Sequence, residues 1–227
     1  MRQLTILTYA LLLLNNIQAH AQEVNWDSLY RPGNFKLKIT QFKSYPNSSK
    51  DIIFLGNSIT AGVDWNELLQ MNTARNRGIS GDISFGILER LDEITEGKPA
   101  KVFILIGIND ISRNIPDAVI MQNYKSIVQR IKQQSPRTKI YFQTLLPVNN
   151  EFTQFRNHYN KDEHILWINE QIKMLGKEQN FTVIDLYTPF LNANKKLDKQ
   201  YTEDGLHLNA AGYKRWASIL KSGNYLK

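Results

Sequence analysis

Residues 101–107 read KVFILIG, a short and almost wholly apolar run that begins at a lysine and ends at a glycine. A run of this length, without alternating polar residues, is typical of a β-strand that is buried on both faces. Three further runs have the same character, namely residues 51–55 (DIIFL), 139–146 (KIYFQTLL) and 181–186 (FTVIDL). Residues 74–78 are a weaker candidate. The sequence therefore predicts about five strands.

Stretches with helical periodicity separate these strands. Apolar residues recur at intervals of three and four within residues 87–94, 120–131 and 165–175, and again within a last amphipathic stretch at 213–220. Alternating strands and helices favour a mostly parallel sheet with helices on both faces and right-handed crossovers. We therefore expect an α/β fold, a three-layer α/β/α sandwich around a mostly parallel sheet of about five strands.

Length and composition bound the possible functions. The 227 residues contain no linker-like stretch, so we expect one domain over residues 51–227, with residues 22–50 as an N-terminal extension that packs on it. The net charge of +7 comes from scattered basic residues, which favours a solvated basic surface over a nucleic-acid groove. Because the chain has no cysteine, disulfides, thiolate metal sites and a cysteine nucleophile are excluded.

Residues 1–21 have the pattern of a secretory signal peptide. Arg2 supplies a positive charge, residues 4–14 are apolar, and Ala19-His20-Ala21 is a small-x-small cleavage pattern. The apolar stretch is too short to cross a hydrocarbon core of roughly 30 Å. We expect cleavage after Ala21 and export to the periplasm or the extracellular space, with no integral membrane segment in the mature protein.

Polar residues follow the predicted strands at the points where the strands end. Ser58 follows the first strand, Gly81 the second, and Asn109 the third, and Asp204 and His207 lie near the C-terminus. Ligands bind beyond the carboxyl ends of parallel strands, and acyl transfer needs a hydroxyl, a base, an orienting carboxylate and amide donors. Taken singly, each residue also has a plain structural role, such as a helix cap, a turn or a satisfied polar group.

Four motifs resemble those of the SGNH hydrolases, also called the GDSL esterase/lipase family. They are FLGNSITAG at residues 54–62, NRGISGD at 76–82, GIND at 107–110 and DGLHLN at 204–209. The resemblance extends from about residue 51 to residue 220. It implies the flavodoxin-like fold of that family and a serine esterase that uses neither a metal nor an organic cofactor.

The resemblance also implies the roles of individual residues. Ser58 is the expected nucleophile, His207 the base and Asp204 its partner, while the backbone N–H groups of Ser58 and Gly81 and the side chain of Asn109 form the expected oxyanion hole. Independently of the family, Asp204 and His207 are three residues apart, so a single turn can bring the carboxylate onto the imidazole.

The first two motifs most resemble the branch that contains platelet-activating-factor acetylhydrolase subunits and carbohydrate O-acetylesterases. This resemblance implies short acyl groups, acetyl first, on a small-molecule or glycan alcohol. Two alternatives remain, a lysophospholipase or thioesterase with a longer acyl slot, and a non-catalytic glycan-binding module. One position departs from the family pattern, because Asn57 stands where an aspartate usually precedes the nucleophile. The sequence predicts no particular oligomeric state.

Competing motifs fail on their spacing. The segment after the first strand lacks the second glycine of the G-x-S-x-G elbow, which argues against an ordinary α/β-hydrolase. His158 and His164 are six residues apart and form no helical i, i+4 pair, so we predict no metal site there. Aromatic residues such as Phe155 are assigned to core and loop packing rather than to a sugar platform.

Overall fold

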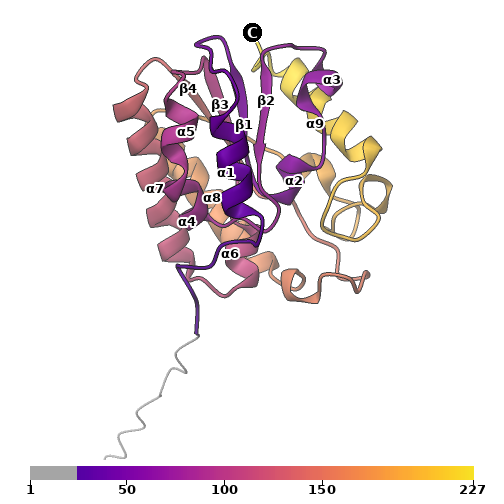
Figure 1. Ribbon diagram of the computed structural model, residues 1–227. Helices are drawn as coiled ribbons and strands as arrows, with labels where there is room; N and C mark the ends of the chain where they lie inside the picture. The colour runs from indigo at the N-terminus through magenta and orange to yellow at the C-terminus, as the bar shows by residue number, and fades with distance from the viewer. Residues whose placement is uncertain (1–24) are drawn as a thin grey trace, which may run out of the picture.

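Five parallel strands form the central layer of the molecule (Figure 1). The computed structural model describes residues 25–227, and the predicted signal peptide at residues 1–21 lies outside the described residues. In the sheet the strand order is β2-β1-β3-β4-β5. The strands are β1 (Ile52–Gly56), β2 (Ala74–Gly78), β3 (Lys101–Leu105), β4 (Lys139–Gln143) and β5 (Thr182–Ile184), and every pairing between them is parallel. The prediction of a parallel sheet of about five strands is confirmed.

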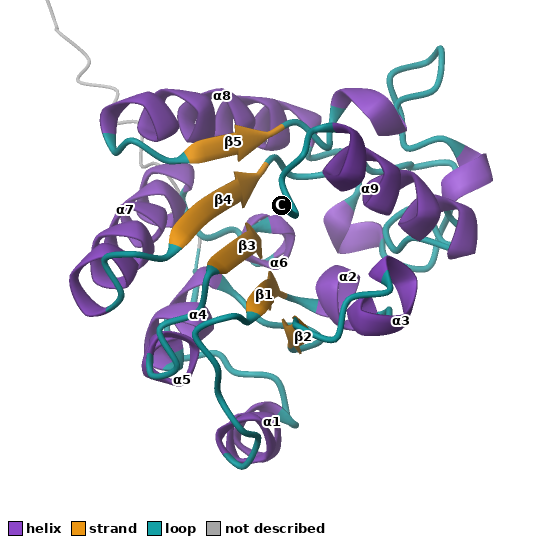
Figure 2. Cartoon of the chain, turned by 90° about the horizontal axis from the view of Figure 1, so that it is seen from above, coloured by secondary structure: helices purple, strands orange, loops and turns teal. Residues whose placement is uncertain are grey.

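Helices cover both faces of the sheet, as Figure 2 shows from above. On one face, α7 packs against α4, α5 and α8, and on the other α3 packs against α9. The helices of the described residues are α1 (Phe35–Lys43), α2 (Ser58–Ala61), α3 (Trp65–Leu69), α4 (Ser84–Glu89), α5 (Leu91–Thr95), α6 (Ile108–Ser112), α7 (Asp117–Gln134), α8 (Asp162–Glu178) and α9 (Ala210–Ser222), with 3-10 turns η1 (Arg156–His158), η2 (Thr188–Phe190) and η3 (Lys199–Tyr201).

A row of aromatic rings joins the sheet to its covering helices. Phe54, Phe103 and Tyr141 are neighbours in register on β1, β3 and β4, with ring centroids 5.0 and 4.5 Å apart. Trp65 of α3 stacks on Phe54 at 4.0 Å, and Trp216 of α9 meets Trp65 edge-on at 4.7 Å. Because large buried rings contribute much of the hydrophobic stabilisation, this row holds α3 and α9 onto the sheet.

The strand order determines where a ligand can bind. The chain runs from β1 outward to β2 and then returns across β1 to β3, so the connections after β1 and β3 leave in different directions. In open α/β sheets the crevice outside such a switch point is the usual ligand site. Ser58 comes directly after β1 and Asn109 after β3, so both lie at this crevice.

One predicted helical stretch is broken in the structure. The apolar repeat at residues 87–94 predicts a continuous helix, but α4 ends at Glu89 and α5 begins at Leu91. Arg90 between them has φ −103° and ψ 12°, outside the helical range. Its side chain turns into the interior and pairs with the buried carboxylate of Asp82. A tertiary ion pair thus overrides the local helical pattern at this residue.

The segment before β1 packs on the rest of the domain. Phe35 and Phe42 of α1 form a small buried cluster with Ile79, which follows β2. Nearer the N-terminus, Trp26 stacks on Phe85 with ring centroids 6.1 Å apart. Within residues 25–227, no helix combines the length and apolar character needed to cross a membrane.

Candidate active site

Ser58 is the first residue of α2, directly after the central strand β1. Asn57 caps this helix, because its side-chain oxygen accepts a hydrogen bond from the N–H of Ile59 at 3.0 Å. Such a cap satisfies one of the backbone N–H groups that a helix start leaves unpaired. The bond uses only the side-chain oxygen, so Asn57 performs here a capping task that an aspartate can also perform.

The hydroxyl of Ser58 meets the ring of His207. Ser58 Oγ lies 2.9 Å from His207 Nε2, and His207 Nδ1 lies 2.7 Å from Asp204 Oδ2. A carboxylate only accepts hydrogen bonds, so Nδ1 carries the ring proton and Nε2 is left to accept the hydrogen of Ser58. The three residues predicted as nucleophile, base and orienting acid therefore lie in one hydrogen-bonded chain, and all three are half-buried.

A tight turn brings Asp204 onto His207. Gly205 between them has φ +76°, a conformation that favours glycine, and Asp204 Oδ1 accepts the N–H groups of Leu206 and His207 at 2.9 and 2.8 Å. Burial raises the pKa of Asp204, but the hydrogen bonds from the ring and backbone of His207 and from Leu206 outweigh it. The net pKa lies below its usual value, so the carboxylate is charged at neutral pH.

Gly81 and Asn109 line the same cavity as Ser58 and His207. The cavity has a volume of about 390 Å³ and is lined by Ser58, Ser80, Gly81, Asn109, Ser112, Arg113, Phe155, His158, Leu206 and His207. Gly81 has φ +80°, which a residue with a Cβ rarely adopts. Asn109 belongs to α6, is 8% exposed, and donates from Nδ2 to the carbonyl of Asp82 at 2.9 Å. Four of the five residues predicted for the site thus line this cavity, and the fifth, Asp204, lies behind His207.

Comparison with known families agrees with this arrangement. The model of the GDSL-like lipase/acylhydrolase family matches residues 54–215, which include every residue of the predicted site. The chain belongs to this family. The resemblance inferred from the four motifs is confirmed, and the GDSL-like acylhydrolase is a carboxylic ester hydrolase.

Individual relatives of this acylhydrolase are similar over most of their length. Subunit alpha2 of platelet-activating factor acetylhydrolase IB from Rattus norvegicus is 27% identical over 169 residues, which are 72% of this chain and 71% of the relative. A solved structure from Streptococcus pneumonia, provisionally assigned as a platelet activating factor, is 30% identical with a TM-score of 0.78, covering 86% of this chain and 93% of that one. A GDSL-like lipase from Bacteroides thetaiotaomicron is 26% identical with a TM-score of 0.73, covering 84% and 96%.

A buried carboxyl group connects the third motif of the acylhydrolase to the start of α4, just after the second motif. Asp110, next to Asn109, is fully buried and accepts hydrogen bonds from both the N–H and the hydroxyl of Ser84. Asn123 of α7 in turn donates to the Ser84 hydroxyl. Burial raises the pKa of Asp110 to about 7, although the bonds from Ser84 oppose the shift. This network fixes α6, and with it Asn109, against the segment that carries Gly81.

The two histidines considered for a metal site contact different groups. His158 Nε2 lies 3.0 Å from Asn109 Oδ1, whereas His164 Nδ1 lies 2.8 Å from Asp117 Oδ2. Among residues 25–227, no group of three or more histidine and acidic side chains is arranged to hold a metal ion. His158 thus belongs to the surroundings of Asn109, whereas His164 is an exposed partner of Asp117.

Several residues in or beside the cavity have no sequence pattern that would assign them to the site. Phe155, assigned to packing from the sequence, meets the His207 ring edge-on at 4.9 Å. Tyr30 and Pro32 of the N-terminal segment come close to Gly81, and the Arg113 guanidinium lies 3.1 Å from the centre of the Tyr30 ring. These residues are far apart in sequence and follow no periodicity, so only the tertiary structure brings them to the site.

Proposed function

We propose that the chain hydrolyses short-chain esters, acetyl esters first, through Ser58, His207 and Asp204. The observation that carries the proposal is the pair of contacts from Ser58 Oγ to His207 Nε2 at 2.9 Å and from His207 Nδ1 to Asp204 Oδ2 at 2.7 Å. Nucleophile, base and orienting acid in hydrogen-bond contact are the arrangement that acyl transfer to a serine requires.

The chemistry follows from these contacts. Ser58 Oγ attacks the ester carbonyl carbon while its proton moves to His207 Nε2, and the negative charge of Asp204 stabilises the imidazolium that forms. The tetrahedral intermediate then expels the alcohol, which takes the proton from Nε2. A water molecule attacks the acyl-serine in the same way, with His207 again as base, and releases the carboxylic acid and the free serine.

The oxyanion of each intermediate needs donors that are already in place. The backbone N–H of Ser58 stands at the first position of α2, where a helix leaves its N–H groups without intrahelical partners. The Gly81 N–H and the Asn109 amide are the other two donors of the proposal, since both residues line the cavity beside Ser58. Loss of one such donor typically lowers the rate by a factor of ~10²–10³.

The packing beside the cavity supports a short acyl group. An apolar hollow shares Leu206 with the catalytic cavity and is lined otherwise by Asn57, Ile59, Leu105, Ile108, Leu145, Leu146, Pro147 and Val148, but its volume is only about 10 Å³. A space of that size holds about one water molecule, which is too little for a long acyl chain. A longer chain would have to lie in the open part of the cavity, in contact with water.

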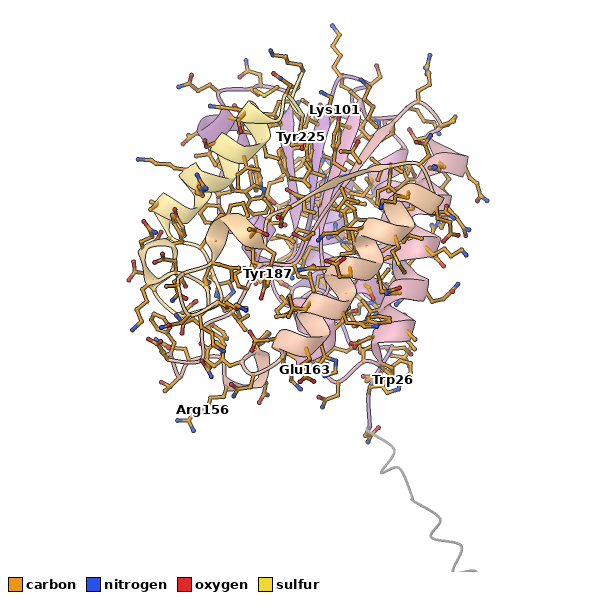
Figure 3. All side chains as sticks on the ribbon, turned by 180° about the vertical axis from the view of Figure 1, so that it is seen from behind. Trp26, Lys101, Arg156, Glu163, Tyr187 and Tyr225 are labelled. Carbon is orange, nitrogen blue, oxygen red and sulfur yellow. The ribbon has the colours of Figure 1, made fainter. Side chains whose placement is uncertain are left out.

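The surroundings of the cavity mouth support a carbohydrate as the alcohol. A neighbouring hollow of about 440 Å³ shares Ser112, Arg113 and His158 with the cavity and is lined further by Asn25, Trp26, Asp27 and Asn157. Trp26, 37% exposed, offers an aromatic surface, and the amide, carboxylate and guanidinium groups offer donors and acceptors. This combination suits a ring with many hydroxyl groups. Trp26 lies where the described chain begins (Figure 3).

We also propose export, which rests on the sequence pattern of residues 1–21. Expression of the full chain should yield a mature N-terminus at Gln22 outside the cytoplasm. Cytoplasmic protein with an intact Met1 would contradict this part of the proposal.

Active-site labelling tests the nucleophile. A fluorophosphonate probe should modify the wild-type protein once, at Ser58, and should leave Ser58→Ala unlabelled. Ser80 is the informative internal comparison, because its side chain lines the same cavity. Modification mapped to Ser80 would mean that the nucleophile is misassigned.

A series of p-nitrophenyl esters separates the proposed function from its alternatives. The acetate should be hydrolysed with a higher kcat/KM than the octanoate or palmitate, with Ser58→Ala as the blank. A preference for palmitate would instead indicate a lysophospholipase or thioesterase, and no hydrolysis above the blank would indicate a binding module. Measuring the acetic acid released from acetylated glycans then tests the proposal that the alcohol is a carbohydrate.

A further inference from the structure

His158 contacts the amide proposed as an oxyanion donor. It is the last residue of η1, and its Nε2 lies 3.0 Å from Oδ1 of Asn109, 49 residues earlier in the chain. Both side chains line the catalytic cavity. None of the four motifs includes His158, so the contact places a residue from a surface loop directly behind a residue of the third motif.

The hydrogen bonds around Asn109 determine which way its amide points. The carbonyl of Asp82 can only accept a hydrogen bond, so the amide atom 2.9 Å from it is Nδ2. The carbonyl oxygen Oδ1 therefore faces His158, and His158 Nε2 must carry the hydrogen between them. The Asn109 amide is thus held at both ends, with one hydrogen of Nδ2 donated to Asp82 and the other available.

The His158 ring is suited to donate from Nε2 only. Burial lowers its pKa to about 4, and the positive charge that His207 carries when protonated and that of Arg113 act in the same direction, so the ring is neutral at neutral pH. A neutral imidazole carries one N–H, and here it lies on Nε2. Nδ1 is buried and meets no partner among the described residues, so a proton placed there would be left unpaired.

We propose that His158 is a positioning residue for the oxyanion hole, which it serves by fixing and polarising the side chain of Asn109. The inference rests on the proposed function, because it presumes that Asn109 binds the oxyanion. A hydrogen bond donated to the amide oxygen holds the free N–H in place before the reaction, and it draws electron density from the nitrogen, which makes that N–H a stronger donor.

The loop that carries His158 is itself attached to the other catalytic groups. The Phe155 ring lies edge-on against both His158, at 5.9 Å, and His207, at 4.9 Å. The Tyr159 hydroxyl donates to the backbone carbonyl of Asp204 and accepts the N–H of Phe155. Residues 155–159 thus connect the oxyanion side of the site to its base and acid, which places the His158 ring accurately.

Two amide variants of different reach provide the central test. In His158→Gln the side-chain amide nitrogen can occupy the place of Nε2, whereas in His158→Asn it is one methylene too short. With p-nitrophenyl acetate we expect His158→Asn to lower kcat by ~10-fold or more, with KM changed less than twofold, and His158→Gln to recover most of the loss. Arg156→Ala is the matched control, because Arg156 belongs to the same turn but points away from the protein (Figure 3) and should leave kcat unchanged.

A double-mutant cycle distinguishes positioning from a separate catalytic or structural role. If His158 acts through Asn109, His158→Asn should have little further effect on kcat in the Asn109→Ala background. Losses that multiply, or a wild-type kcat in His158→Asn, would overturn the inference while leaving the proposed function intact. A wild-type kcat in Asn109→Ala would instead overturn the oxyanion role itself. Melting temperatures of all variants, expected to stay close to wild type, exclude unfolding as the cause.

Discussion

The guanidinium of Arg90 lies 3.0 Å from the carboxylate of Asp82, measured from Nε to Oδ2, and neither side chain has any exposed surface. The same guanidinium donates through Nη2 to the carbonyls of Gly56 and Arg77, at the ends of β1 and β2. Burial raises the pKa of Asp82, and the pairing with Arg90 opposes this shift. One buried cation thereby joins the backbone segments that lead to Ser58 and to Gly81.

Replacing Arg90 should therefore damage both stability and activity. Arg90→Met fills a similar volume, but it leaves the buried Asp82 carboxylate without its cationic partner and removes the side-chain donor to the Gly56 and Arg77 carbonyls. We therefore expect a loss of about 3–5 kcal/mol in unfolding free energy. A fluorophosphonate should also label the folded Arg90→Met variant more slowly than the wild type, because Arg90 no longer joins the segments that lead to Ser58 and Gly81. Urea unfolding and labelling rates measure the two effects. Lys173→Ala, which breaks an exposed pair with Glu170, should change neither.

The contacts of Asp204 predict different outcomes for two substitutions. In Asp204→Asn the oxygen can still accept the N–H of His207, but an amide nitrogen would face Nδ1 and favour the wrong ring tautomer. By analogy with serine proteases, where this change has been worked out, kcat should fall by as much as ~10⁴. Asp204→Ala leaves the ring free to find water and should be milder. Equal losses in the two variants would argue against tautomer control.

The burial of Asp110 predicts a pH-dependent stability. The carboxyl group keeps its proton up to about pH 7 in the folded chain, whereas an aspartic acid in the unfolded chain loses its proton near its ordinary pKa of 3.8. Between these values the folded state binds more protons, so stability falls as pH rises, by at most about 1.4 kcal/mol per pH unit for one group. The stability of Asp110→Asn should lack this contribution to the pH dependence, because asparagine does not titrate. Urea unfolding of both proteins from pH 4.5 to 7.5 measures the difference, and a constant difference would mean that Asp110 titrates normally.

The conformation of Gly81 predicts a cost for adding a single methyl group. At φ +80° an alanine is strained by roughly 1–2 kcal/mol, and its Cβ would lie 3.3 Å from Pro32 Cβ and 3.4 Å from the Tyr30 hydroxyl. Gly81→Ala should lower the melting temperature by several degrees. It should also reduce kcat, because the strain moves the backbone N–H of residue 81, which is a proposed oxyanion donor. Gly33→Ala is the matched control because its Cβ would meet no atom within 4 Å. Similar behaviour of the two variants would contradict the role given to the Gly81 backbone.

Local patterns in the sequence were sufficient for much of this fold and for the five residues of the candidate site. Continuous apolar runs such as KVFILIG predict the buried strands, and the motifs lie where those runs end. Asp204 and His207 are close enough in sequence for one turn to join them. The prediction of one continuous helix at residues 87–94 was wrong, because the apolar repeat does not indicate that the Arg90 side chain is buried against Asp82.

The sequence by itself determined the α/β class, the family and the residue types available for acyl transfer, because these depend on contiguous patterns and on motifs at strand ends. Only the tertiary structure decided that β1 and β3 lie side by side, that Arg90 pairs with Asp82, and that His158 supports Asn109. Contacts of that kind join segments far apart in the chain and depend on strand order and helix packing. They leave no periodic trace in the sequence, since each is made by a single side chain whose partner is chosen by the fold.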